Sequence, residues 1–139
     1  MKQILLITLG LSVALFADFT KSGNIVIDGT TGLQWQDDAV YSLTWTAAIE
    51  HCEDLSLDGH SDWRLPNLNE LTSIVDDTKH NPCIDNAVFQ NTASSVYWSS
   101  TALVRYPSFA WYVSFRGGSQ YYSKTKTSSY YVRCVRARQ

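Results

Sequence analysis

The spacing of apolar residues changes along this chain from a helical repeat to a strand repeat, and this change constrains the fold most strongly. Between Trp45 and Leu55, apolar side chains recur every three or four residues, as on one face of an α-helix. Between Phe109 and Arg116, apolar positions alternate, and Gly117-Gly118 follows as a signal for a two-residue hairpin turn. Separate helical and strand blocks predict the α+β class.

Other local signals extend this outline. Asn67 and Glu70 have the spacing of a capping box, so we expect a second helix that carries Leu68, Leu71, Ile74 and Val75. The remaining elements that we expect are strands at 24–27, 33–36, 120–124 and 130–136, a very short strand or extended segment at 62–65, and a long loop at 76–95. The whole pattern predicts two helices packed on a curled antiparallel sheet with long loops.

The first seventeen residues have the pattern of a secretory signal peptide. Lys2 is followed by an apolar run from Ile4 to Phe16, and Ala17 offers a small residue for cleavage. The run is shorter than the about 20 residues of a membrane span. We therefore expect a signal peptide at 1–17 and a single periplasmic or secreted domain at 18–139, without stable membrane insertion after cleavage. An uncleaved anchor is the alternative.

Three cysteines allow at most one bridge within the chain, and export makes a disulfide plausible. Cys52 lies on the apolar stripe of the first predicted helix, and Cys134 lies in an apolar terminal strand. We therefore predict that Cys52 pairs with Cys134. Cys83 lies in a polar loop, where it is either a free thiol or a link to another chain.

Charge is divided unevenly along the sequence. All thirteen Asp and Glu residues lie at or before Asp85. The cations that follow are Arg105, Arg116, Lys124, Lys126, Arg133, Arg136 and Arg138. Such a region can attract an anionic partner although the net charge of the chain is −2. The alternative interpretation is that these cations only occupy solvent-facing strand positions.

No group of residues points to catalysis or to a metal centre. His80 and Cys83 have a ligand-like spacing, but zinc sites usually need a second such pair. Asp76, Asp77 and Asp85 could offer oxygen ligands to calcium, but their spacing matches no calcium loop. The serines lack a Gly-x-Ser-x-Gly context, and no glycine-rich phosphate loop is present. We predict no catalytic residue, no metal site and no cofactor.

Tyrosines beside the cations provide the candidate binding residues. Tyrosine rings can stack on the apolar face of a sugar while Arg and Lys pair with sulfate or carboxylate groups. The predicted ligand-binding residues are Arg105, Tyr106, Arg116, Tyr121, Tyr122, Lys124 and Lys126. The same chemistry suits single-stranded nucleic acid, but the expected export argues against that partner.

Six segments in a fixed order carry a family resemblance. They are 31–35 (TGLQW), Thr44-Trp45 with Cys52, 61–67 (SDWRLPN), 97–101 (YWSST), 110–113 (AWYV) and 131–136 (YVRCVR). In this order they resemble the bacterial extracytoplasmic family that includes the C-terminal domain of the collagen-like adhesin Lcl. The resemblance covers about Ile25 to Arg136. The Arg-Leu-Pro segment and the closing Val-Arg-Cys-Val-Arg also resemble the sulfatase-modifying-factor group.

The resemblance implies a C-type-lectin-like fold that binds ligands on its loops. In such folds a helix cysteine commonly bridges to the last strand, in agreement with the predicted pairing. For the collagen-like adhesin it implies trimerisation and binding of sulfated glycosaminoglycans. This sequence contains no collagen repeat, and it lacks the Glu-Pro-Asn, Gln-Pro-Asp and Trp-Asn-Asp signatures of calcium-dependent sugar binding. The paired cysteines of the sulfatase-modifying enzymes have no counterpart.

We therefore expect a non-enzymatic, adhesin-like module that recognises an anionic glycan or surface polymer. A structural or protein-interaction domain of the cell envelope is the alternative. The sequence leaves the ligand and homo-oligomerisation open.

Overall fold

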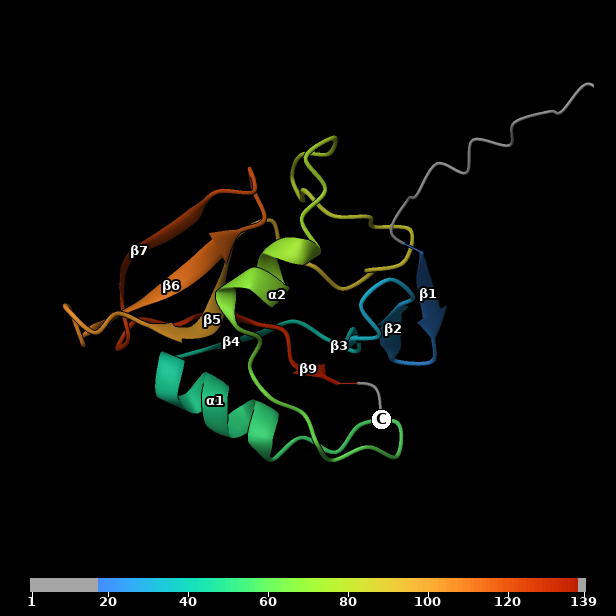
Figure 1. The fold of residues 1–139 in the computed structure, drawn as a ribbon, viewed down its shortest axis with the longest axis horizontal. Coiled ribbons are helices and arrows are strands. Elements are labelled where there is room, and N and C mark those ends of the chain that lie inside the picture. Colours follow the sequence, from blue (N-terminus) through green and yellow to red (C-terminus); the bar gives the residue numbers. More distant parts are fainter. Residues whose placement is uncertain (1–17, 138–139) are drawn as a thin grey trace, which may run out of the picture.

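A computed structural model describes residues 18–137, so the predicted signal peptide at 1–17 lies outside the described residues. Within the described part, two short helices and nine strands form two sheets (Figure 1). The helices are α1 (Trp45–Glu53) and α2 (Leu68–Ser73). The strands are β1 (Phe19–Ser22), β2 (Ile25–Asp28), β3 (Gln34–Gln36), β4 (Tyr41–Leu43), β5 (Val96–Ala102), β6 (Phe109–Ser114), β7 (Gln120–Thr125), β8 (Tyr130–Val132) and β9 (Val135–Arg136). The α+β prediction is confirmed.

The strands form two sheets, so the prediction of a single curled sheet is wrong. The smaller sheet has the strand order β1-β2-β3-β9, and the larger has the order β4-β8-β5-β6-β7. Neighbouring strands are antiparallel except for β5 and β8, which run parallel. Strand β7 forms one edge of the larger sheet and β4 forms the other.

The reason for two sheets is a break in the strand that the sequence predicts at 130–136. Strand β8 pairs with β4 and β5, whereas β9 pairs with β3. Between them, the Cys134 N–H donates to the Gln36 side chain, and the Cys134 carbonyl accepts from the Gln36 N–H at 2.9 Å. The chain therefore crosses from one sheet to the other at Arg133 and Cys134.

Both predicted helices are present, and each ends about two residues earlier than expected. The Asn67 side chain accepts a hydrogen bond from the Glu70 N–H at 2.8 Å, and the Glu70 carboxylate accepts from the Asn67 N–H at 2.9 Å. This reciprocal pair is the predicted capping box. Thr44 occupies the N-cap of α1 without a side-chain hydrogen bond to the helix.

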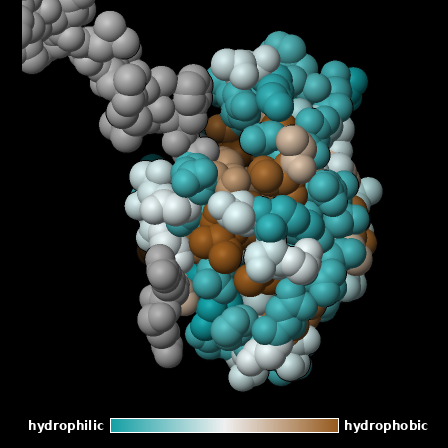
Figure 2. Space-filling model, turned by 90° about the vertical axis from the view of Figure 1, so that its right-hand side faces the viewer, coloured by the Kyte–Doolittle hydropathy of each residue, from teal (hydrophilic) through white to brown (hydrophobic). Residues whose placement is uncertain are grey.

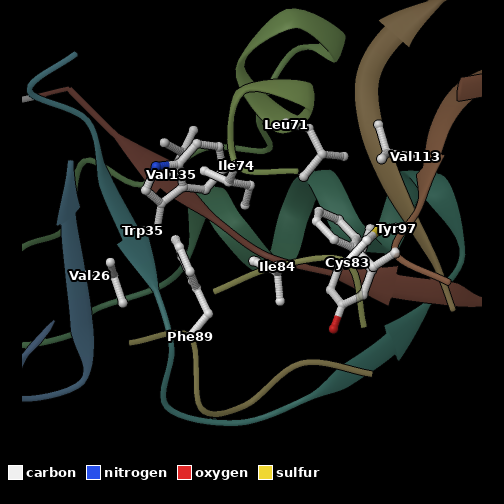
Figure 3. Packing of buried hydrophobic residues seen from close by; sticks show 11 residues of the cluster. Val26, Trp35, Leu71, Ile74, Cys83, Ile84, Phe89, Tyr97, Val113 and Val135 are labelled. Atoms are coloured by element: carbon white, nitrogen blue, oxygen red, sulfur yellow. The ribbon is translucent and has the colours of Figure 1, made fainter. Parts of the chain in front are cut away.

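Two apolar clusters fill the interior, and β6 contributes to both. Val113 and Phe115 belong to a cluster with Trp35 of β3 and Leu71 of α2 (Figure 3). Ala110 and Tyr112 belong to a second cluster, beneath α1. The predicted alternation along β6 is therefore correct, and each of its faces contributes residues to one cluster. Figure 2 shows the side of β1 and β2, where apolar atoms gather within a hydrophilic border.

Cys52 and Cys134 form the predicted disulfide. Their Cα atoms lie 5.4 Å apart, and both residues are fully buried. The bridge joins α1 to the crossing between the two sheets. Cys83 is a buried free thiol, which favours the first of its two predicted alternatives.

The predicted two-residue hairpin at Gly117-Gly118 is longer in the structure. The last strand pair joins Val113 to Gln120, and residues 115–119 connect β6 to β7. Phe115 is fully buried, and its carbonyl accepts a hydrogen bond from the Cys83 N–H at 2.8 Å. The Phe115 N–H donates to the Ser95 carbonyl at 2.8 Å, so both backbone groups of Phe115 are bonded outside the β6–β7 pair.

Candidate functional site

Two of the cations that follow Asp85 are structural. Arg133 is buried, and its guanidinium bonds the Asp37 carboxylate at 3.0 Å. Arg136 is also buried and bonds the Asp62 carboxylate at 2.6 Å. Arg138 lies outside the described residues. The four cations that remain for a ligand are Arg105, Arg116, Lys124 and Lys126.

The carboxylate of Asp37 is the centre of a buried ionic network. It accepts hydrogen bonds from Lys21, Arg133 and the backbone N–H groups of Gln90 and Asn91. Burial by itself raises the pKa of Asp37, but the contacts with Lys21, Arg133 and Asn91 outweigh it and lower the pKa below its usual value. The network ties the loop at 76–95 to the segment that follows β3, and its role is structural.

A groove of about 310 Å³ lies beside the β6–β7 pair. Its lining residues are Tyr106, Phe109, Tyr122 and Ser123. The rings of Tyr106 and Phe109 meet edge to face with centroids 6.4 Å apart. Tyr106 and Tyr122 are 49% and 48% exposed. The groove therefore presents aromatic surface and hydroxyl groups to solvent, which is chemistry for binding a ligand.

A β-bulge shapes this groove. Ala110 pairs with Lys124 and Tyr112 pairs with Tyr121, so Trp111 lies opposite both residues between them, Tyr122 and Ser123. A bulge of this kind re-aims side chains and strengthens the local twist. The rings of Trp111 and Tyr122 meet edge to face at 4.9 Å. Trp111 thus packs against Tyr122, one of the residues that line the groove.

The two candidate lysines and Tyr121 lie on the opposite face of the sheet. Consecutive strand residues point to opposite faces, so Tyr112 faces away from Trp111. Tyr121 stacks near Tyr112 at 5.8 Å, and the Lys124 ammonium lies 5.8 Å from the same ring. Lys124 also lies 5.3 Å from the Tyr130 ring, and Lys126 lies 4.0 Å from the Trp45 ring of α1.

The two candidate arginines lie at opposite ends of the β6–β7 hairpin. Arg105 is exposed in the β5–β6 loop, directly before the groove residue Tyr106. Arg116 is exposed in the β6–β7 turn, where its carbonyl accepts from the Asn81 N–H at 3.4 Å. Neither arginine forms an ion pair within residues 18–137.

The structure thus divides the seven predicted binding residues among three places. Tyr106 and Tyr122 meet in the groove, with Arg105 adjacent to it. Tyr121, Lys124 and Lys126 lie on the α1 side of the sheet, and Arg116 lies in the far turn. Sequence reasoning missed Phe109, Trp111 and Ser123. The alternation from Phe109 to Phe115 was the available signal, but it predicts only a strand and does not show which of its residues reach a groove.

Two further findings concern the described residues. Within 18–137, no group of three or more His, Cys, Asp or Glu side chains could hold a metal ion. No helix among the described residues has the length and apolar character to cross a membrane.

A search of curated proteins finds nothing similar. The family model described as Lcl C-terminal domain matches residues 24–136, from the residue before β2 to the end of β9. This match covers both helices, the disulfide and every strand except β1. The chain belongs to the Lcl C-terminal domain family.

Proposed function

We propose that this protein is a non-enzymatic module that recognises an anionic glycan or surface polymer through the aromatic groove and Arg105. The observation that carries this proposal is the pair of half-exposed rings, Tyr106 and Tyr122, in one groove. A tyrosine offers an apolar ring and a polar tip. Such side chains suit a pyranose ring, which has an apolar face edged by hydroxyl groups.

Charge supports an anionic rather than a neutral polymer. Residues 86–137 contain no Asp or Glu, and Arg105 is exposed beside the groove. Lys124 and Lys126 lie on the other face of the edge strand β7. A polymer longer than one ring can therefore fill the groove and continue over this edge toward the lysines. Their positive potential also increases the rate of encounter with an anion at moderate salt.

We also propose that the domain has a C-type-lectin-like fold and acts outside the cytoplasm. The disulfide between a helix and the crossing into the last strand supports the lectin-like assignment. A buried disulfide is typical of oxidising compartments, which agrees with the apolar N-terminal sequence. In this setting the groove would meet polymers of the cell envelope or of the extracellular space.

Retention on immobilised heparin, an anionic polysaccharide, tests the proposal. The wild-type protein should be retained at physiological salt. Tyr122→Ala should weaken the affinity about fivefold, the size of one lost aromatic contact. Arg105→Glu should also elute earlier. Arg116→Glu is the matched control because it makes the same charge change at the far end of the hairpin, and its affinity should change less than about twofold.

Equal losses for Arg105→Glu and Arg116→Glu would show that retention reports net charge and not the groove. Absence of retention at low salt, with circular dichroism showing intact folding, would contradict the proposal. That second result would favour the alternative, a structural or protein-interaction domain.

A further inference from the structure

The β5–β6 loop carries the most exposed large apolar side chain among residues 18–137. Val104 is 99% exposed. Isolated apolar residues on a protein surface are common and need no explanation by themselves. The surroundings of Val104 are what distinguish it, because exposed apolar, aromatic and cationic residues follow one another at the tip of a single loop.

The loop tip is held in place at its base. Val104, Arg105, Tyr106 and Pro107 are all exposed. The Phe109 N–H donates to the Tyr106 carbonyl at 3.0 Å and closes a turn. The loop forms the extremity on the left of Figure 1, beyond the ends of β5 and β6. Val104 is therefore presented away from the body of the protein.

The neighbouring loop adds to this surface without adding an acidic group. The Lys126 N–H donates to the Ser108 carbonyl at 2.9 Å and thereby joins the β7–β8 connection to the β5–β6 loop. Between Lys126 and Tyr130 this connection contains only Thr and Ser. The tip of the molecule thus combines an apolar side chain, a tyrosine and positive charge.

We propose that this tip is a peripheral membrane contact, in which Val104 and the Tyr106 ring enter the interfacial layer of an anionic bilayer. Arg105 would pair with lipid phosphate groups. Tyrosine favours membrane interfaces, and each cation near an anionic bilayer strengthens binding about fivefold. Tyr106 and Arg105 also belong to the proposed glycan site, whereas Val104 does not line the groove and therefore distinguishes the two proposals.

The size of the feature favours a bilayer over a protein partner. A specific protein interface buries at least about 1,000 Å² with a well-packed apolar centre, which one valine and one tyrosine do not supply. A bilayer surface requires only a few apolar side chains together with positive charge.

Partition onto lipid vesicles tests this inference. Wild type and variants are mixed with phosphatidylcholine vesicles that contain either 30% phosphatidylserine or none. All proteins are the full chain, so any contribution of residues 1–17 to binding is the same in each. Wild type should prefer the anionic vesicles. Val104→Asp should reduce this binding about tenfold, because the variant loses apolar burial and gains repulsion. Val104→Phe should increase it.

Val40 provides the matched control, because it is an exposed valine that precedes β4 at the opposite edge of the same sheet. Val40→Asp and Val40→Phe should change vesicle binding less than twofold. A polarity-sensitive fluorophore on Val104→Cys should shift to shorter wavelength with anionic vesicles, whereas the same label on Val40→Cys should not.

Equal effects at positions 104 and 40, or equal binding to both kinds of vesicle, would overturn the inference. Heparin retention separates it from the proposed glycan function. Val104→Phe leaves every charge in place, so it should raise vesicle binding and leave heparin retention unchanged. If Val104→Phe changed vesicle binding and heparin retention to the same extent, the loop would be part of one nonspecific binding surface. That result would also overturn the inference.

Discussion

The ammonium group of Lys126 lies 4.0 Å from the centre of the Trp45 ring. The same two residues share a backbone hydrogen bond, from the Trp45 N–H to the Lys126 carbonyl at 3.1 Å. The Trp45 indole N–H also donates to the Ser99 carbonyl of β5 at 2.9 Å. The start of α1 is thus fastened to β5 and to the end of β7. A cation predicted to bind ligand therefore also holds the helix in place.

Lys126→Met removes this cation–π contact and keeps the apolar stem of the side chain. We expect the free energy of unfolding to fall by about 0.5–1 kcal/mol, the typical value of such a contact near a surface. Urea denaturation followed by tryptophan fluorescence measures the change. Lys79→Met is the control, because Lys79 makes only an exposed ion pair, at 3.6 Å, with Asp85. Similar losses in both variants would argue against a specific role for Trp45.

Removal of the disulfide should be the most destabilising single change in the covalent structure. The bridge spans a sequence separation of 82 residues. Its loss increases the conformational entropy of the unfolded chain, which lowers the free energy of unfolding by about 4–5 kcal/mol. We expect the Cys52→Ala/Cys134→Ala variant to be largely unfolded at 37 °C by circular dichroism. Cys83→Ala should remain folded under the same conditions. Unchanged denaturation of wild type after chemical reduction would contradict this expectation.

Cys83 should be unreactive in the folded protein. Burial raises the pKa of its thiol and so disfavours the nucleophilic thiolate. A thiol reagent should modify Cys83 only as fast as the protein unfolds, whereas the exposed thiol of Val104→Cys should react at once. Dimers linked through Cys83 on a non-reducing gel would disprove the prediction and restore the intermolecular alternative.

Stability should fall in acid through the Asp37 network. The folded protein holds the pKa of Asp37 below its ordinary value, so the carboxylate stabilises the fold above about pH 4, and this contribution is lost as the pH falls further. Asp37→Asn should cost about 3–5 kcal/mol at pH 7, because it leaves the buried Arg133 without its counterion. Urea denaturation between pH 6 and pH 2 should show a shallower dependence in the variant. Parallel curves would exclude this carboxylate as a source of acid sensitivity.

Gly118 should resist substitution more strongly than its neighbour Gly117. Gly118 has a φ of +81°, and an added Cβ would lie 2.9 Å from the Val75 side chain. Gly118→Ala should therefore lower the free energy of unfolding by about 1–3 kcal/mol. Gly117 has open space around its Cα, so Gly117→Ala is the matched control and should stay within about 1 kcal/mol of wild type. Thermal denaturation of both variants provides the comparison.

Local patterns were enough to predict the helices and the β6–β7 pair. The stripe from Trp45 to Leu55 and the capping box at Asn67 each depend on residues a few positions apart. Strand β5 was missed because Tyr97, Trp98 and Ser99 are all buried. A strand covered on both faces shows no alternation, so its signal resembles that of any short apolar run.

The aromatic groove was predicted only in part. Tyr106 and Tyr122 were identified because they are amphipathic and lie near cations. The sequence did not predict that Tyr122 and Lys124 lie on opposite faces of the sheet. Their placement depends on a bulge in which Trp111 lies opposite two residues of β7. A bulge adds one residue to one strand of a pair, and the single-strand pattern does not show which residue that is.

The sequence alone determined the segregation of charge, the α+β class and the pairing of Cys52 with Cys134, because each follows from residue types and their immediate neighbours in the chain. Only the tertiary structure decided which cations are available to a ligand. Arg133 reaches Asp37 across 96 positions, and Arg136 reaches Asp62 across 74. A buried charge requires a partner, and the fold supplies that partner from acidic residues far away along the chain.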